Sequence, residues 1–221
     1  MQRIDVAAQN LANLTTPGYK ARRAFSDFLT DGQLTLADTA LQPSRAPVID
    51  ASPGKLRSTG NSFDLAISGR GFFVVKSADV TYYTRDGQFD RDSDGRLVTG
   101  DGMVLQSSAG DVTVSGANLT VSQDGTILDQ GEPVARLTIA DFGDAKSLQP
   151  AGGNVFTAAT SPQDVASPTI RQGMLETSNV SQADEMISIM GALRGAQSGQ
   201  QMMQVYDELM DRATAAFGQA A

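Results

Sequence analysis

The densest group of potential ligand side chains lies near the middle of the chain. Asp90, Asp92 and Asp94 alternate ahead of Gly95, and Asp101 stands at the twelfth position counted from Asp90. This is the spacing of an EF-hand calcium loop, except that glutamate usually takes the twelfth position. The flanking residues have strand patterns rather than helix patterns, and Asp-Gly pairs are common in hairpin turns. We therefore favour a hairpin turn and keep calcium binding as the alternative.

Two other short patterns could bind or activate a ligand, and each has a simpler interpretation. Gly69-Arg70-Gly71 could surround a phosphate, but no helix pattern and no Gly-Lys-Ser/Thr sequence follows it. A tight turn before a buried strand is the better interpretation. Asp184 and Glu185 are paired carboxylates, but they fall in the first turn of an expected helix, where negative charge is favourable. Neither pattern predicts an active site.

Several residue types are missing from the 221 residues of the chain, namely cysteine, histidine and tryptophan. Their absence excludes cysteine nucleophiles, imidazole bases, disulfides, and zinc sites with thiolate or imidazole ligands. The 25 acidic and 17 basic residues leave a net charge of -8, which argues against binding to nucleic-acid phosphates. No run of about 20 apolar residues predicts a membrane span. We expect no enzyme activity, no cofactor, no metal site and no membrane insertion.

Helix patterns occupy both ends of the chain. In residues 1–14, spacings of three, four and three residues separate Ile4, Ala7, Leu11 and Leu14. Pro17 ends that pattern, because the residue before a proline is pushed out of the helical region. A longer pattern covers residues 181–217, with a serine at position 181 as a plausible N-cap. At about 1.5 Å per residue this helix would be about 55 Å long, more than a compact domain needs.

The long helix has its own apolar stripe. Seven of its ten heptad positions a and d are apolar. They are Met186, Ile189, Leu193, Ala196, Met203, Met210 and Phe217. Gly191, Gly195 and Gly199 repeat every four residues, which we interpret as sites of close helix contact in an assembly. Isolated helices are marginal in water, so both terminal stripes need partners.

The middle of the chain carries short strand patterns separated by Gly, Asp, Asn and Ser. Because no helix pattern lies between them, they predict an antiparallel sheet rather than a parallel one. We assign residues 61–177 to this β domain and residues 21–60, with three prolines, to an extended arm or hairpin. Residues 1–20 with 178–221 form a terminal helical domain. The predicted fold class is α+β, an all-β middle domain inserted between N- and C-terminal helices that form a coiled-coil-like pair or bundle.

Three motifs, in order along the chain, resemble the signatures of the bacterial flagellar rod and hook family. The first is residues 9–20, where an Asn-Leu-Ala-Asn helix end precedes Thr-Pro-Gly-Tyr-Lys. The second is residues 64–73 together with 83–89, and the third is residues 172–180. The resemblance covers essentially the whole chain. The short middle favours a rod subunit over a hook subunit, and the C-terminal sequence is more similar to the proximal-rod type than to the distal-rod type.

The resemblance implies a structural subunit that assembles axially around a central export channel and transmits motor torque to the hook. Its implied partners are proximal and distal rod subunits, in homo- and hetero-oligomeric assembly, with hook-side and ring proteins as further candidates. The implied location is the periplasm-spanning rod of the basal body, reached through the flagellar type III channel without a cleaved signal. Family members usually have a further helical turn before Ile4, so we expect a shortened N-terminal helix here.

The residues expected at subunit contacts follow the two helix stripes and the first motif. They are Ile4, Ala7, Asn10, Leu11, Asn13, Leu14, Met186, Ile189, Leu193, Ala196, Met203 and Met210. A second hypothesis rests on the acidic loop alone: a secreted, calcium-stabilised β binding module with a coiled-coil tail. A calcium-dependent melting temperature would favour that hypothesis.

Overall fold

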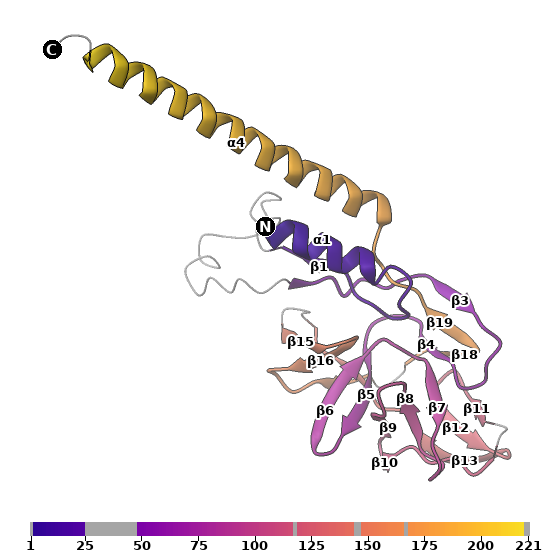
Figure 1. Ribbon diagram of the computed structural model, residues 1–221. Coiled ribbons are helices and arrows are strands. Elements are labelled where there is room, and N and C mark those ends of the chain that lie inside the picture. Colours follow the sequence, from indigo (N-terminus) through magenta and orange to yellow (C-terminus); the bar gives the residue numbers. More distant parts are fainter. Residues whose placement is uncertain (1, 25–47, 117–118, 144–146, 166–167, 219–221) are drawn as a thin grey trace.

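A computed structural model describes residues 2–24, 48–116, 119–143, 147–165 and 168–218. Helices stand at both ends of this part of the chain, α1 (Gln2–Ala12) and α4 (Gln182–Gly218), and strands fill the middle (Figure 1). All the strand pairs in the described residues are antiparallel. The predicted α+β class, with a β-rich middle between two helices, is therefore confirmed.

The strands are short, as the closely spaced turn residues predicted. In the first half of the chain they are β1 (Arg22–Arg23), β2 (Val48–Ile49), β3 (Leu56–Ser58), β4 (Leu65–Ile67), β5 (Phe72–Ser77), β6 (Val80–Thr84), β7 (Phe89–Arg91), β8 (Leu97–Thr99), β9 (Val104–Ser107) and β10 (Gly110–Asp111). In the second half they are β11 (Leu119–Val121), β12 (Thr126–Asp129), β13 (Glu132–Arg136), β14 (Ile139–Asp141), β15 (Leu148–Gly152), β16 (Val155–Ala158), β17 (Gln163–Asp164), β18 (Ile170–Gln172) and β19 (Met174–Glu176).

The largest sheet has the strand order β15-β16-β6-β5-β9-β8-β7, and β10, β14 and β17 pair beside this path. Strands β11, β12 and β13 form a second sheet. Two-stranded ribbons join distant parts of the chain: β1 with β2, β4 with β18, and β3 with β19. We call the chain from β4 to β18 the β region. Its first and last strands pair, so the chain enters and leaves the β region at neighbouring points.

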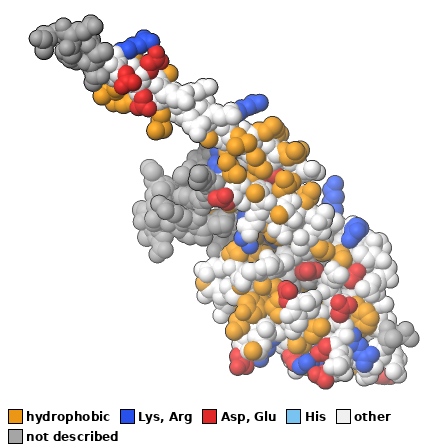
Figure 2. Space-filling model, viewed as in Figure 1, with side chains coloured by type: hydrophobic (Ala, Val, Ile, Leu, Met, Phe, Trp, Pro, Cys, Tyr) orange, Lys and Arg blue, Asp and Glu red, His pale blue; other side chains and the backbone are white. Residues whose placement is uncertain are grey.

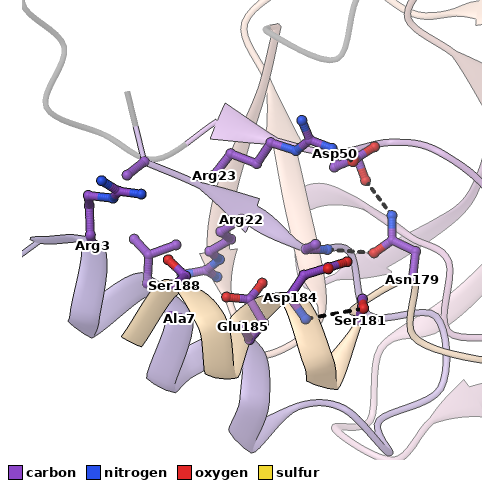
Figure 3. Close-up of a pocket in the computed structure, with 13 residues that line it drawn as sticks. Arg3, Ala7, Arg22, Arg23, Asp50, Asn179, Ser181, Asp184, Glu185 and Ser188 are labelled. Carbon is purple, nitrogen blue, oxygen red and sulfur yellow. Dashed lines mark hydrogen bonds and ion pairs between the residues drawn. The ribbon is translucent and has the colours of Figure 1, made fainter. Parts of the chain in front are cut away.

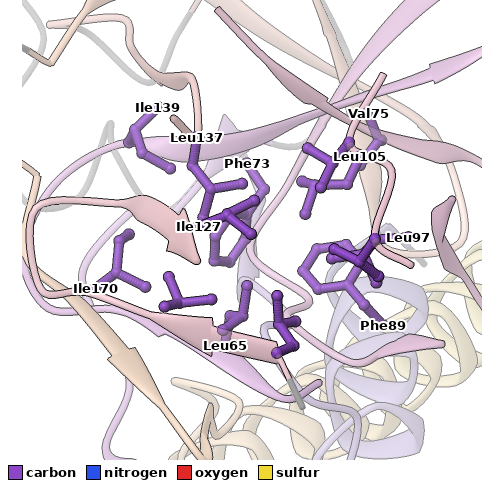
Figure 4. Close-up of a cluster of buried hydrophobic side chains, with 14 of the residues drawn as sticks. Leu65, Phe73, Val75, Phe89, Leu97, Leu105, Ile127, Leu137, Ile139 and Ile170 are labelled. Carbon is purple, nitrogen blue, oxygen red and sulfur yellow. The ribbon is translucent and has the colours of Figure 1, made fainter. Parts of the chain in front are cut away.

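The core of the β region explains why β5 lacks alternating polarity. Phe73 and Val75 point into the larger hydrophobic cluster (Figure 4), whereas Phe72 belongs to a second cluster. Strand β5 is thus covered on both faces, and a strand covered on both faces reads as a continuous apolar run. In the larger cluster, the rings of Phe73 and Phe89 meet edge to face with their centroids 5.4 Å apart. Such pairs stabilise a core beyond the burial of their area.

The two helices run antiparallel, and α4 continues far past α1 and past the β region (Figure 1). The predicted start of the long helix is confirmed. Ser181 lies just before it, and the Asp184 amide donates a long 3.4 Å hydrogen bond to the Ser181 hydroxyl, as an N-cap does. In the part of the chain that the structure describes, neither helix has the length and hydrophobicity of a membrane span.

The expected arm or hairpin over residues 21–60 falls largely on residues 25–47, which lie outside the described residues. Its two described ends pair with each other, because β1 and β2 form an antiparallel ribbon in which Arg22 faces Ile49. Strand β3 then pairs with β19, directly ahead of α4. The described ends of this segment therefore lie between the helices and the β region.

Candidate functional site

The most exposed hydrophobic surface of the described chain follows α4. Met202 and Met203 expose 77% and 70% of their surface, values that are high for large apolar side chains. Figure 2 shows hydrophobic side chains gathered over this helix. Among the α4 side chains that the structure describes, the exposed large apolar ones are Met186, Ile187, Met190, Leu193, Met202, Met203, Val205, Tyr206, Leu209 and Met210. They form two groups, residues 186–193 and 202–210, separated by a mostly polar and glycine stretch. Exposed apolar patches of this kind are typical of an interaction site.

The structure places the twelve predicted contact residues in three kinds of environment. Ala7 and Asn10 are buried within the chain itself. Partly buried positions are Ile4, Leu11, Asn13, Leu14 and Ile189. Exposed positions are Met186, Leu193, Ala196, Met203 and Met210. Helix α1 thus packs against α4 within the chain. Contact of the exposed residues with other subunits remains a prediction.

The glycines of α4 lie in open space. A Cβ atom added at Gly191, Gly195 or Gly199 would meet no neighbouring atom within 4 Å. The close helix contact that we interpret from their spacing therefore requires a neighbouring chain. Glycine also weakens a helix by about 1 kcal/mol relative to alanine, so this part of α4 gains little from its own sequence.

The buried side chain of Asn10 in α1 forms hydrogen bonds that connect α1 to α4. Its side-chain amide nitrogen donates to the Arg22 carbonyl at 2.8 Å and to Glu185 Oε1 at 2.7 Å. Its side-chain oxygen accepts from the Arg22 amide at 2.8 Å and from the Tyr19 hydroxyl at 3.3 Å. One buried asparagine thus links α1, the segment after it, and the first turn of α4. Burial raises the pKa of the Tyr19 hydroxyl, which keeps it protonated as a donor.

Three buried charged residues meet between the helices and the β region. Lys20 Nζ lies 2.5 Å from Glu176 Oε1, and Arg85 Nη1 lies 2.9 Å from Glu176 Oε2. The side chains of Lys20, Glu176 and Arg85 are 0%, 1% and 2% exposed. Such burial is rare for charged residues unless they are paired. Lys20 belongs to the first motif, Arg85 to the second and Glu176 to the third. Membership of these motifs is the sequence signal that could have indicated the cluster.

Asn179 and Gly18 make further contacts beside the Lys20–Glu176–Arg85 cluster. The Asn179 side chain accepts from the Ala21 amide at 2.7 Å and donates to the Ser52 carbonyl at 3.0 Å. Gly18 has φ +64°, and a Cβ atom there would lie 2.2 Å from the carbonyl carbon of Arg85. Only glycine allows the two backbones to approach this closely. We call the set Gly18, Lys20, Ser52, Gly54, Arg85, Glu176 and Asn179 the joint.

A groove of about 270 Å³ lies between α1, β1 and the start of α4 (Figure 3). Its charged lining consists of three arginines and three carboxylates: Arg3, Arg22, Arg23, Asp50, Asp184 and Glu185. These charges balance, so the groove does not favour a ligand of either sign. Its acidic members also have other partners: Asp50 pairs with Arg23 at 2.9 Å, and Glu185 accepts from Asn10.

The acidic loop is a hairpin turn, as favoured above. Strands β7 and β8 pair across it, with Asp90 facing Val98. Asp92 accepts hydrogen bonds from the backbone amides of Asp94 at 2.9 Å and Arg96 at 2.8 Å. The Arg96 guanidinium completes the turn through Nε, 2.8 Å from Asp92 Oδ2. In the described residues, no cluster of three or more acidic side chains is arranged to hold a metal ion.

Two family models match the chain. Residues 66–128 match the model described as the flagellar hook protein FlgE/F/G D1 domain. Residues 171–216 match the model described as the C-terminal part of the flagellar basal body rod FlgEFG proteins. The first match lies within the β region, and the second covers β19, the approach to α4 and most of that helix.

Full-length relatives match over nearly the whole chain. The flagellar basal-body rod protein FlgG of Agrobacterium fabrum is 31% identical, over 93% of this chain and 90% of its own length. The flagellar basal-body rod protein FlgF of Caulobacter vibrioides is 32% identical, over 97% and 91%. FlgF of Escherichia coli is 32% identical, over 94% and 89%. The chain belongs to the family of flagellar basal-body rod proteins that includes FlgF and FlgG.

Proposed function

We propose that this chain is a structural subunit of the flagellar basal-body rod and that the exposed face of α4 packs against neighbouring subunits. The observation that carries the proposal is the helix itself: α4 is 37 residues long, and most of its large apolar side chains contact solvent in the single chain. A helix of this kind gains stability when its apolar face is buried. Assembly with other basal-body components would bury it.

The partners we propose are other rod subunits, proximal and distal, with hook-side and ring proteins at the ends of the rod. The terminal helices would line a central export channel, and the β region would form an outer layer. The role is mechanical rather than catalytic, because buried helix faces resist shear when torque passes along the rod. We also propose that the chain reaches the periplasm-spanning rod through the flagellar export channel, without a cleaved signal.

The type of rod subunit is a finer question. Relatives named FlgG and FlgF match with similar identities, 31% and 32%. The order of residues in the last part of α4, with Met202 and Met203 ahead of Asp207 and Glu208, supports the proximal type. We therefore propose the proximal rod as the place of this subunit. The division into a terminal helical domain and residues 61–177 as a β domain likewise remains our proposal.

The test is Leu193→Asp in the full chain, because Leu193 is an exposed residue of the predicted apolar stripe. A charge there cannot be buried against a neighbour without a large desolvation cost. We expect the variant to be missing from purified basal bodies and its cells to be non-motile, while the purified monomer keeps its circular dichroism spectrum. The matched control is Ser198→Asp, which adds the same charge at an exposed polar position of α4. Normal incorporation of Leu193→Asp would overturn the proposal.

A further inference from the structure

The joint connects the helix pair to the β region. Figure 1 shows α1 and α4 on one side of the molecule, joined to the strands through the segments next to β3 and β19. The chain leaves α1 through Gly18 and Lys20 and returns to α4 through Glu176 and Asn179. The angle between the two parts therefore depends on what these segments bind.

Glu176 binds three separate parts of the chain with one carboxylate. Oε1 accepts from Lys20 Nζ at 2.5 Å and from the Gly54 amide at 2.7 Å. Oε2 accepts from Arg85 Nη1 at 2.9 Å. Lys20 follows α1, Gly54 precedes β3, and Arg85 lies in the β region between β6 and β7. The carboxylate is thus the point at which the helix side and the β side are joined.

Lys20 and Arg85 each form a further hydrogen bond to a backbone carbonyl. Lys20 Nζ also donates to the Ser52 carbonyl at 2.7 Å. Arg85 Nη2 donates to the Gly69 carbonyl at 2.6 Å, and its guanidinium carbon lies 5.3 Å from the ring centroid of Phe72. A guanidinium group is planar and presents its donors in a rigid fork, so its bonds fix an angle as well as a distance. Apolar contacts are not directional in this way.

We propose that the Lys20–Glu176–Arg85 cluster fixes the direction in which the helix pair leaves the β region. A buried ion cluster is a weak source of stability, because well-packed apolar residues of similar volume often replace it without loss. Its directional bonds, however, have no apolar substitute. The consequence rests on the proposed function: in a rod subunit, a joint of fixed direction passes torque from the outer β layer to the helix core without bending.

The experiment measures the distance between the two parts of the full chain. Because the sequence contains no cysteine, Ser77→Cys on β5 and Ser198→Cys on α4 provide two unique positions for spin labels. Pulsed electron paramagnetic resonance should give one narrow distance peak for the otherwise unchanged chain. The decisive variant is K20M/R85M/E176L, which replaces the whole cluster by apolar side chains. We expect the narrow peak to be lost in this variant, while circular dichroism and amide protection of the β core are retained.

Two controls make the result interpretable. Arg23→Gln breaks the exposed ion pair with Asp50 beside the joint and should leave the narrow peak unchanged. Arg85→Met removes the ion pair with Glu176, together with the Arg85 contacts inside the β region, and leaves the contact between Lys20 and Glu176. We expect it to broaden the distance even where the triple variant does not fold. A narrow peak that persists in folded Arg85→Met would overturn the proposal. Because the measurement uses the free chain, its outcome does not depend on whether Leu193→Asp assembles.

Discussion

Arg85 and Glu176 are 91 residues apart in the sequence, yet their side chains meet at 2.9 Å with almost no exposure to solvent. Arg85 follows strand β6, and Glu176 ends strand β19, five residues before the N-cap of α4. The contact therefore joins the β region to the segment that leads into the long helix. Lys20 reaches the same carboxylate from a point 156 residues away.

Removing the negative charge at the joint should destabilise the whole chain. Glu176→Gln keeps the shape of the side chain but leaves Lys20 and Arg85 buried without a counter-charge. We expect the free energy of unfolding to fall by about 3 to 5 kcal/mol. Urea denaturation followed by circular dichroism measures this change. For the exposed ion pair between Arg23 and Asp50, we expect Arg23→Gln to cost no more than about 1 kcal/mol. Equal effects of the two substitutions would contradict the assigned importance of burial.

The stability of the chain should depend on the ionisation of Asp86. The pKa of Asp86 is raised to about 6, chiefly because the carboxylate is buried. The hydrogen bond from the Gln88 amide lowers this pKa, and the nearby carboxylates of Asp101 and Asp64 raise it. Between the ordinary pKa of 3.8 and about 6 the folded state binds more protons at this site than the unfolded state. The contribution of Asp86 to the free energy of unfolding therefore becomes more favourable as the pH falls through about 6 towards 3.8.

Asp86→Asn tests this dependence, because asparagine keeps an acceptor for the Gln88 amide without the charge. We expect the variant to be more stable than the original chain at about pH 7.5, by about 2 kcal/mol or less, and the difference to shrink towards about pH 4. Urea denaturation at a series of pH values measures it. A difference that stays constant over this range would show that Asp86 does not titrate as described.

We expect that no residue with a side chain can replace Gly87 without destabilising the fold. A Cβ atom at this position would lie 1.6 Å from the carbonyl oxygen of Leu65, which is part of the backbone and cannot move aside cheaply. Gly87→Ala should lower the free energy of unfolding by about 3 kcal/mol or more, since it forces β4 away from the turn before β7. Gly100 is the matched control, because a Cβ atom there meets nothing within 4 Å. Thermal unfolding of the two alanine variants makes the comparison, and similar melting temperatures would contradict the close approach.

Much of the fold could be predicted from local patterns. The apolar spacing at both ends predicted α1 and α4, and Ser181 marked the start of the long helix within one residue. Short β-branched and aromatic runs between turn residues predicted antiparallel strands, and Asp92 was correctly interpreted as part of a hairpin turn. These features depend on residues within a few positions of one another, so the sequence alone carries the signal.

The joint and the burial of Asn10 depended on the tertiary structure. Asn10 belongs to the predicted contact stripe of α1, but its side chain is saturated by Tyr19, Arg22 and Glu185 of its own chain. Lys20, Arg85 and Glu176 lie one in each of the three motifs, so the sequence marks each residue, but it does not show that the three are in contact. Hydrophobic periodicity reports which face of an element is buried, whereas the pairing of charges far apart in sequence depends on the path of the whole chain between them. That path is decided by strand register and core packing, which are long-range properties that no local pattern encodes.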